Sequence, residues 1–371
     1  MNYDVIVVGC GLSGAVLAER YATIGKKVLI LEKRDHIGGN CYDYVDETGI
    51  LCNRYGAHIF HTNYEDVWEY VNRFDTWERY EHKVLGAINE KIVPIPANIT
   101  TVNVLCGKHI QTEAEMNDWL KANQIQYSTI TNSEEMAKSR VGPQLYDAIF
   151  KDYTFKQWGV YPNELKPEVL ARIPVRNNFD ERYFTDKYQA LPKQGYTHFF
   201  ERLLDHPNIT IRLNTDFFSV RHEIPTNCIL IYTGPIDRYF ADQGYDALEY
   251  RSIEFSFERY MNTPYFQQGA VVNYPGVEKP FTRIVEYKHF LHQQSPHTVI
   301  AKEVTTSIGE PYYPVLNDRN MKLFEHYKKL AEKERETKNI HFVGRLANYK
   351  YFNMDEAIKN ALDYFRFLQG N

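Results

Sequence analysis

Two glycine turns near the start of the chain decide the fold. The turn Gly9-Cys-Gly11-Leu-Ser-Gly14 follows the apolar run Asp4-Val-Ile-Val-Val8, and the pair Gly38-Gly39 comes a few residues after the run Val28-Leu-Ile-Leu31. Short, continuously apolar, β-branched runs are typical of strands that are buried on both faces of a parallel sheet. A glycine turn between such a strand and a helix, here predicted over 15–23, lets a pyrophosphate approach the helix N-terminus. The stretch predicts a Rossmann-like α/β domain that holds an adenine dinucleotide.

The positions within these turns have separate tasks. We expect Gly9 to permit the tight turn, Gly11 to let a pyrophosphate approach the backbone, and Gly14 to allow close packing of helix on strand. Glu32, at the end of the second strand, is placed to accept hydrogen bonds from a ribose, and its charge disfavours the 2′-phosphate of NADP. An NAD site has no particular need of the second glycine pair, which suits a loop along the pyrophosphate or ribityl chain of a flavin. The doublet therefore favours FAD over NAD, and a plain surface turn at the second pair is the alternative.

Composition limits the classes of function. The 371 residues predict two or three domains, and the net charge of −5 gives no footprint for nucleic acid. The five cysteines are scattered without a C-x-x-C pair, which predicts a reduced compartment and no zinc site. No apolar stretch is long enough to cross a membrane, and Met1 leads directly into the first strand. We expect a cytoplasmic protein that inserts into no membrane and binds no nucleic acid.

The pattern along the chain predicts three interleaved domains. Apolar strands recur at 227–234 and 339–345, and a helix follows at 354–368; these segments extend an FAD-binding domain over 1–80, 215–250 and 320–371. Apolar residues at helical spacing over 133–158 predict an inserted helical substrate or lid domain over 97–170. Alternating runs such as 209–213 and 298–301 predict an antiparallel β-sheet domain over 81–96, 171–214 and 251–319.

Few residues suit catalysis by the protein alone. His58 and His61 stand in an extended pattern, Gly56-Ala-His-Ile-Phe-His-Thr62, that points them to opposite faces, and no third ligand is near, so we expect no metal. One of them facing a flavin and a purely structural histidine remain alternatives. The sequence has no Ser-His-Asp order, no nucleophile elbow and no obvious carboxylate pair. A covalent nucleophile would have to come from the cofactor.

Arginines beside aromatic residues form a second theme. The chain has 29 Tyr, and Arg172, Arg283 and Arg345 each stand close to Tyr, Phe or Trp. Arginine binds a diphosphate and aromatic rings stack on a base, so the set suits an anionic substrate with a flat base. The Pro- and Gly-containing stretch 159–178 suits a mobile lid that carries Arg172. In the first turn of the last predicted helix, Asp355 either caps the helix or is an acidic residue without a capping role.

Several longer strings carry a family resemblance. GCGLSGAVLAE, EKRDHIGGNCYD, YGAHIFHT, YTFKQWG, ARIPVR, LPKQGYT, FTRIVEYKHF, EPYYPV and GRLANYKYFNMD resemble the prokaryotic-type UDP-galactopyranose mutases in order and spacing over essentially the whole chain. The resemblance implies an isomerase that interconverts UDP-galactopyranose and UDP-galactofuranose with FAD as cofactor. It implies covalent catalysis by N5 of the reduced flavin, without net redox change. It also implies that NAD(P)H or another external reductant reduces the flavin. A homodimer is the form that the family implies.

The resemblance also implies roles for individual residues, which we carry over by position. As catalytic residues it implies Arg172, Arg283, His58 and His61. For substrate binding it implies Tyr153, Thr154, Trp158, Arg172, Tyr183, Arg283, Tyr313, Tyr351 and Asn353. For cofactor binding it implies Gly9, Gly11, Ser13, Gly14, Glu32, Lys33, Gly38, Gly39, Asn40, His58, Ile59, Arg345, Asn353, Met354 and Asp355. Asn353 departs from the Asp of several members, and Ile149 stands where some members have an aromatic ring.

Other functions stay open at this point. A flavin oxidoreductase of the amine-oxidase or desaturase type begins with a similar glycine doublet, and a redox sensor could hold FAD for structure alone. The polar, arginine- and tyrosine-rich later segments argue for a nucleotide substrate. Within the mutases, UDP-N-acetylgalactosamine or UDP-arabinose could be the sugar nucleotide.

Overall fold

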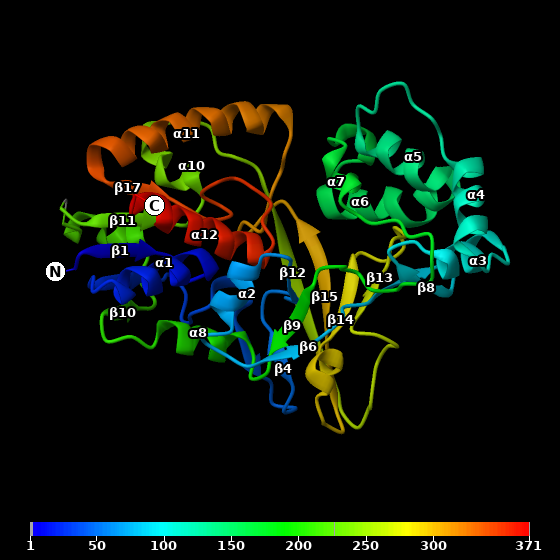
Figure 1. Cartoon of the computed structure of the whole chain (residues 1–371), viewed down its shortest axis with the longest axis horizontal. Coiled ribbons are helices and arrows are strands. Elements are labelled where there is room, and N and C mark those ends of the chain that lie inside the picture. The colour runs from blue at the N-terminus through cyan, green and yellow to red at the C-terminus, as the bar shows by residue number, and fades with distance from the viewer. Residues whose placement is uncertain (1–2, 226, 371) are drawn as a thin grey trace.

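The computed structural model describes residues 3–225 and 227–370, and a five-stranded parallel sheet forms its larger lobe (Figure 1). The strand order is β10-β2-β1-β11-β17. The strands are β1 (Val5–Val8), β2 (Val28–Leu31), β10 (Ile209–Arg212), β11 (Ile229–Tyr232) and β17 (Ile340–Phe342). Every residue of β1 and β2 is buried, as expected for strands covered on both faces. The predicted return of two late strands to this sheet is confirmed.

Helices cover both faces of this sheet. One face packs on α1 (Leu12–Thr23), α8 (Tyr196–Leu204) and α12 (Met354–Leu368). The other packs on α9 (Phe217–Val220), α10 (Ile236–Tyr239) and α11 (Asp318–Lys338). The short α2 (Glu65–Val71) contacts α12 on the first side. Since β1 alternates between the two clusters, with Val5 and Val7 in one and Ile6 and Val8 in the other, its unbroken apolar run is explained.

One predicted part of the antiparallel sheet domain is wrong. Residues 209–213 were expected there, but β10 pairs in parallel with β2, with Ile209 opposite Val28. The nearby α8 is a helix inside the range predicted as antiparallel sheet. A short β-branched run carries no information on the direction of its partner, so tertiary packing decides it.

A second, seven-stranded sheet has the order β16-β12-β15-β14-β13-β7-β8. Its long strands β12 and β15 are antiparallel, whereas β13 pairs with β7 in parallel. The strands are β7 (Val84–Ile88), β8 (Lys91–Ile95), β12 (Tyr250–Tyr260), β13 (Val271–Asn273), β14 (Arg283–Glu286), β15 (Thr298–Thr306) and β16 (Tyr313–Pro314). Two small antiparallel sheets flank it: β3 (Asp43–Val45) with β4 (Leu51–Asn53), and β5 (Phe60–Thr62) with β9 (Tyr188–Pro192) and β6 (Trp77–Arg79).

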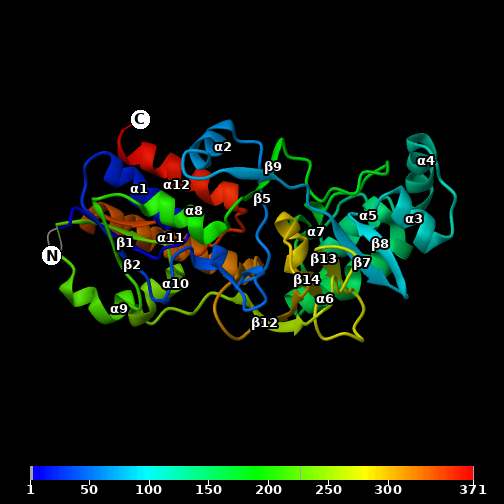
Figure 2. The ribbon, with the colours of Figure 1, turned by 90° about the horizontal axis from the view of Figure 1, so that it is seen from below.

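A group of helices forms the other lobe, and both views show it separated from the parallel sheet along the long axis (Figures 1 and 2). The helices are α3 (Ile99–Cys106), α4 (Glu113–Asn123), α5 (Ser133–Leu145), α6 (Asp152–Trp158) and α7 (Glu168–Ala171). Between α5 and α6 the backbone makes a π-helical turn, Tyr146–Lys151, a feature that is frequent at functional sites. Among the described residues no helix is long and apolar enough to cross a membrane. The Rossmann-like α/β fold class is confirmed; the exact domain boundaries stay a prediction.

Candidate functional site

The two glycine turns meet at the carboxyl end of the parallel sheet. The Gly38 N–H donates to the Cys10 carbonyl at 3.0 Å. A β-carbon built on Gly39 would lie 2.8 Å from the α-carbon of Gly11, and Gly39 has a φ of +56°. Only glycine tolerates both this backbone conformation and this approach. The two glycine turns are therefore in contact and form one continuous surface.

Glu32 holds the backbone of the first glycine turn and of the residues that follow β2. Its carboxylate accepts the Cys10 N–H at 2.8 Å and the Arg34 N–H at 2.9 Å, one on each oxygen. The residue is 5 % exposed and lines the cleft described below. Each carboxylate oxygen can accept a second hydrogen bond, so a ribose hydroxyl can still be bound. The structure thus adds a structural task to Glu32, and its contact with a ribose stays a prediction.

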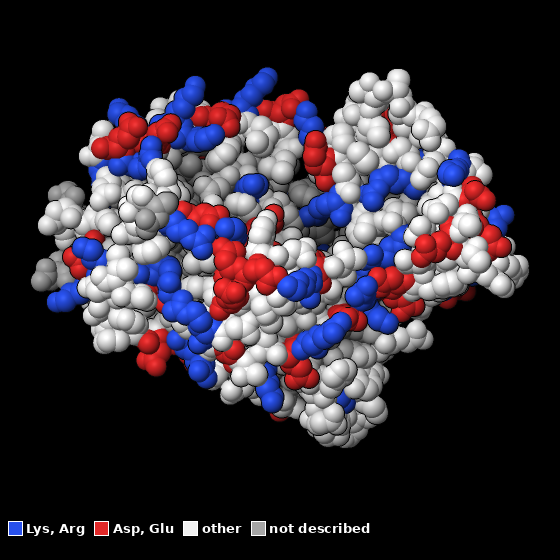
Figure 3. Space-filling view, viewed as in Figure 1, with Lys and Arg blue, Asp and Glu red and all other residues white. Residues whose placement is uncertain are grey.

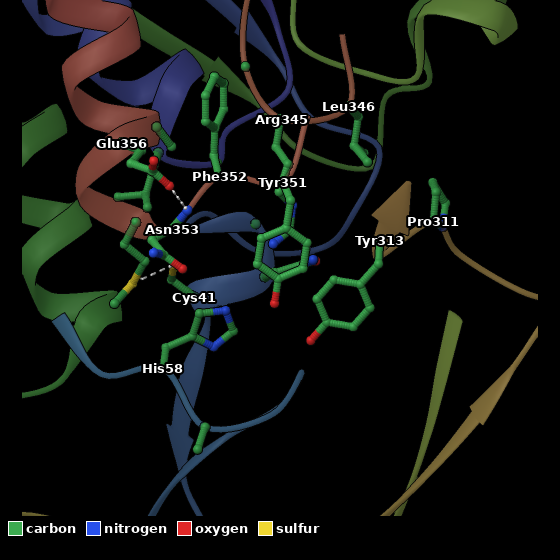
Figure 4. A pocket seen from close by; sticks show the side chains of 18 of the residues that line it. Cys41, His58, Pro311, Tyr313, Arg345, Leu346, Tyr351, Phe352, Asn353 and Glu356 are labelled. Carbon is green, nitrogen blue, oxygen red and sulfur yellow. Dashed lines mark hydrogen bonds between the residues drawn. The ribbon is translucent and has the colours of Figure 1, made fainter. Parts of the chain in front are cut away.

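Two helices begin at the same place. The N-cap of α1 is Gly11, with no side-chain hydrogen bond at that cap, and Ser13 in its first turn lines the cleft. The N-cap of α12 is Asn353, whose N–H donates to Glu356 Oε2 at 2.8 Å (Figure 4). Free backbone N–H groups and the positive end of the helix dipole favour an anion at such ends. The N-terminus of α1 therefore suits a pyrophosphate, and the N-terminus of α12 suits a polar or negatively charged edge of a cofactor ring.

Two residues predicted to bind the cofactor lie elsewhere. A β-carbon on Gly14 would come within 2.0 Å of the Gly9 carbonyl oxygen, so Gly14 serves the packing of α1 on β1 and does not line the cleft. Asp355 is 5 % exposed and is also absent from the lining. Because Asn353 is the N-cap of α12, the capping role considered for Asp355 is wrong. Burial raises the pKa of Asp355, although nearby Thr62 and His61 oppose the rise.

A cleft of about 1090 Å³ runs from the glycine turns to the helical lobe. Figure 3 shows the molecule hollowed between its two lobes, with Lys and Arg side chains at the rim. Apart from Gly14 and Asp355, every predicted site residue lines it: Gly9, Gly11, Ser13, Glu32, Lys33, Gly38, Gly39, Asn40, His58, Ile59, His61, Tyr153, Thr154, Trp158, Arg172, Tyr183, Arg283, Tyr313, Arg345, Tyr351, Asn353 and Met354. The volume exceeds that of most single-ligand pockets, which suits a dinucleotide together with a second nucleotide.

Arginines and tyrosines converge in the middle of this cleft. The rings of Tyr313 and Tyr351 stack with centroids 5.4 Å apart and extend side by side into the cavity (Figure 4). The guanidinium carbon of Arg172 lies 4.2 Å from the Tyr351 ring centroid, and that of Arg345 lies 5.6 Å from the Tyr313 ring centroid. Arg283 enters from β14, with Nε 3.1 Å from Glu303 Oε2. Within residues 3–225 and 227–370 these three arginines form one ion pair, that of Arg283 with Glu303, so the centre keeps a net positive charge that suits a diphosphate.

The charge of this centre acts on the tyrosines. Burial alone would raise the pKa of Tyr351, but the positive charges of Arg172, Arg345 and Arg283 outweigh it and lower the pKa below its ordinary value. Burial, and then Tyr351, raise the pKa of Tyr313 although Arg283 and Arg345 oppose the rise. The phenol of Tyr351 is thus a strong hydrogen-bond donor toward an anion.

Both predicted histidines line the cleft but differ in their hydrogen bonds. The His58 ring bonds to the Gly56 carbonyl through Nδ1 at 2.8 Å, and since a carbonyl only accepts, Nδ1 carries the proton. Burial lowers the pKa of His58 to about 4, so its ring is neutral near pH 7. His61 bonds through Nδ1 to Asp186 Oδ2 at 3.1 Å. Within the described residues no cluster of three or more His, Cys, Asp or Glu could hold a metal ion.

Several lining residues were missed by the sequence analysis. Near Arg283, His82 Nδ1 and Asn273 Oδ1 are buried without a hydrogen-bond partner in the described part of the chain. Burial first, then Arg283 and His61, lower the pKa of His82 to about 3, so this ring too is neutral. The far end of the cleft beyond β11 is lined by Thr215, Asp216, Phe217, Phe218, Thr233, Gly234, Pro235 and Arg238. Their position at the carboxyl ends of parallel strands is the signal that could have found them.

The residues present fit a flavin dinucleotide. The open surface over Gly11 and Gly39 accommodates a pyrophosphate between α1 and β2, because a β-carbon on Gly11 would meet nothing closer than 3.9 Å. Glu32 and the segment beyond β11 lie at one end of the cleft, and the N-terminus of α12 with His58 lies nearer the arginines. An extended dinucleotide therefore has donors for its phosphates and a pocket for each end.

Known proteins give independent support. The family model of UDP-galactopyranose mutase matches residues 148–351, and the model of NAD(P)-binding Rossmann-like domains matches residues 7–74. A probable UDP-galactopyranose mutase of Klebsiella pneumoniae is 39% identical over 369 residues, which cover 97% of this chain and 93% of the relative. The dTDP-fucopyranose mutase of Escherichia coli is 37% identical over 370 residues, covering 97% and 96%.

A solved structure of reduced UDP-galactopyranose mutase has the same fold. It superposes with a TM-score of 0.77 at 17% identity and covers all of this chain and 94% of its own. At that identity the likeness supports the fold alone, whereas the family model spans more than half of the chain and the relatives nearly all of it. The chain therefore belongs to the UDP-galactopyranose mutase family.

Proposed function

We propose that the protein interconverts UDP-galactopyranose and UDP-galactofuranose in the described cleft, with a flavin bound at the glycine turns. The observation that carries this proposal is the meeting of three arginines, Arg172, Arg283 and Arg345, with the stacked pair Tyr313 and Tyr351. Such a centre stabilises a leaving nucleoside diphosphate. The family relationship supports the same reaction.

The cofactor and the protein divide the work. When bound in its reduced state, the flavin supplies a nucleophilic nitrogen, N5, for the anomeric carbon of the sugar. The protein contributes binding and orientation: the α1 N-terminus holds the pyrophosphate of the cofactor, and Glu32 orients its ribose. Lys33, Asn40, Ile59 and Met354 also line the cleft. NAD(P)H or another external reductant would keep the flavin reduced.

The arginines act on the departing nucleotide. Negative charge grows on the diphosphate oxygens as the bond to the sugar breaks, and Arg172 and Arg283 with Tyr313 and Tyr351 are positioned to stabilise it. Tyr183 lies beside them in the lining. Removing one preorganised donor of this kind costs about 3 kcal/mol of transition-state stabilisation.

The helical lobe supplies the nucleoside end of the site. Tyr153, Thr154 and Trp158 line the cleft on α6, and Ile149 lines it in the preceding π-helical turn. The rings of Tyr153 and Trp158 offer faces for the uracil and ribose. Ile149 gives an aliphatic surface where an aromatic ring would stack, so we expect the base to be held less tightly at that position.

A second candidate substrate is a dTDP-sugar. The similarity to the dTDP-fucopyranose mutase, 37% over 97% of this chain, is close to that with the UDP-galactopyranose mutase relative. Both candidates require the same ring change and the same diphosphate leaving group. They differ at C5 of the base, at the ribose 2′ position and at C6 of the sugar.

One experiment tests the proposal. The flavin-loaded protein is reduced with dithionite under nitrogen and incubated separately with UDP-galactose, UDP-N-acetylgalactosamine, UDP-arabinose and dTDP-fucose, and the products are separated by anion-exchange chromatography. We expect a furanose product from UDP-galactose with the reduced protein and none with the oxidised protein. Conversion of dTDP-fucose alone would establish the second candidate, and failure with all four would refute mutase activity. The homodimer and the cytoplasmic location stay predictions.

A further inference from the structure

His61 and Asp186 form a hydrogen-bonded pair at the wall of the cleft. Nδ1 of His61 lies 3.1 Å from Asp186 Oδ2, and the Asn63 amide donates to Asp186 Oδ1 at 2.8 Å. The Phe184 ring stacks on the imidazole with centroids 3.6 Å apart and planes inclined by 15°. The His61 side chain is 10 % exposed and that of Asp186 is 22 % exposed. The imidazole is thus held by a carboxylate on one edge and a ring on one face.

This geometry determines which nitrogen is available. An ionised carboxylate only accepts, so Nδ1 carries the proton that is shared with Asp186. Nε2, on the far side of the ring, has no hydrogen-bond partner among residues 3–225 and 227–370, and His61 lines the cleft. The hydrogen bond from His61 lowers the pKa of Asp186, which keeps that carboxyl ionised near neutral pH. This is the arrangement that holds a histidine in one tautomer.

The ring change itself requires a proton to move. A pyranose has O5 in its ring and a hydroxyl at O4, whereas a furanose has O4 in its ring and a hydroxyl at O5. The conversion therefore transfers one proton from O4 to O5, and a group that can hold this proton in the cleft would serve both steps.

We propose that Asp186 is a positioning residue that directs Nε2 of His61 into the cleft, where His61 exchanges this proton with the sugar. The inference rests on the proposed function. With the nucleotide displaced, the C1–O5 bond breaks, its electron pair goes to O5, and O5 takes the proton from Nε2 of the imidazolium; the nitrogen nucleophile of the proposed function would supply C1 with the electrons that it loses. O4 then gives an electron pair to C1, its proton passes to Nε2, and the nucleotide returns to C1. His61 ends in the state in which it began, so no co-reactant is consumed.

Two carboxyl groups and one histidine lie near this imidazole. Asp186 precedes β9 and contacts Nδ1, and Asp355 on α12 is close enough for His61 to affect its ionisation. His82, before β7, is a neutral neighbour. Of the two carboxyl groups, Asp186 is the one in direct contact with the ring, so a change at Asp186 acts on His61 most directly.

The first test separates kcat from KM in flavin-loaded, reduced protein. An Asn amide can present either its oxygen or its nitrogen to Nδ1, so Asp186→Asn no longer fixes the tautomer of His61, and kcat should fall about 10-fold with KM within about twofold. Lys187→Ala, a change at the next residue outside the cleft lining, should leave both constants within about twofold. An unchanged kcat in Asp186→Asn, or a change in KM alone, would overturn the inference.

The second test needs no turnover. In protein labelled with ¹⁵N-histidine, His61 is assigned by comparison with His61→Asn, whose amide still donates to Asp186 but lacks a second nitrogen. We expect the neutral ring to carry its proton on Nδ1 in wild type, and both tautomers to be populated in Asp186→Asn. A proton on Nε2 in the neutral wild-type ring, or the same single tautomer in both proteins, would contradict the positioning role. If wild type converts no sugar nucleotide, the proposed function fails, and the NMR spectra still decide whether Asp186 positions His61.

Discussion

Replacing Arg172 by alanine tests the diphosphate centre most directly. The Arg172 side chain is exposed, its Nε donates to the Val169 carbonyl at 3.2 Å, and its guanidinium carbon lies 4.2 Å from the Tyr351 ring centroid. The loss to folding is small, because an exposed cation–π contact contributes about 0.5–1 kcal/mol. The loss to the transition state is larger, at about 2.7–4 kcal/mol for one preorganised donor to a developing anion.

That difference sets the expected result. A loss of about 2.7–4 kcal/mol corresponds to a fall in kcat/KM of roughly 10²–10³-fold. Arg172→Lys keeps the charge but loses the planar fork, so we expect an intermediate fall. The assay is chromatography of the pyranose formed from UDP-galactofuranose by dithionite-reduced protein, with flavin content measured by visible absorbance.

The matched control is Lys166→Ala. Lys166 is an exposed cation on the same segment, it pairs with Asp318 at 2.8 Å, and it does not line the cleft. We expect the rate and flavin content of this variant to stay within about twofold of wild type, because an exposed ion pair contributes little. The reasoning is refuted if Arg172→Ala retains kcat/KM within about threefold, or if it loses its flavin.

Three further outcomes follow from the geometry. Gly39→Ala should lose bound flavin and about 1–3 kcal/mol of stability, measured by absorbance and thermal unfolding, whereas Gly107→Ala, at a similar φ of +62° in open space, should keep its flavin. Lys156 Nζ lies within hydrogen-bonding distance of four carbonyls, those of Tyr274, Gly276, Lys279 and Phe281, among which its three N–H groups donate. Lys156→Met should lower the free energy of unfolding by about 2–4 kcal/mol and, since Lys156 is on α6 with Tyr153 and Trp158, raise KM. Lys151→Met, at an exposed position, should do neither. Burial lowers the pKa of four histidines in the folded state, and for three of them, His58, His82 and His341, the pKa falls to about 3 or 4. Between about pH 6.5 and 4 the unfolded state therefore binds more protons, and stability falls as the pH falls. Urea unfolding at pH 7 and pH 5 should differ less in His341→Gln than in wild type, and an equal difference would contradict this origin.

Much of the parallel sheet could be predicted because its signals are local. The strands 5–8 and 28–31 agree with the apolar runs, and the last helix begins at Met354 as expected. Burial on both faces requires an unbroken apolar run, and a helix that leaves a strand at a tight turn requires glycine there. The pairing of β10 was predicted wrongly because no local signal sets its direction. Its four residues permit either pairing direction, and only the packed sheet decides between them.

The centre of the site could be predicted in part. The resemblance to the mutases indicated the arginines and tyrosines, and they do line one cleft. It did not indicate Asp186 or Phe184, because their contacts with His61 join segments that are more than 120 residues apart. Nor did it separate Gly14 and Asp355 from the residues that line the cleft: Gly14 packs closely on the first turn, as its place in the motif predicted, and Asp355 is buried.

The sequence by itself determined the class of cofactor site, because two glycine turns after buried strands restrict the backbone locally, through steric limits that neighbouring residues impose. The tertiary structure decided that these turns are in contact, with Gly39 against Gly11. It also decided that Tyr313 stacks on Tyr351 and that His61 hydrogen-bonds to Asp186. These contacts depend on how whole sheets and helices pack, and packing is set by the sum of many distant apolar surfaces. No local pattern in the chain carries that sum.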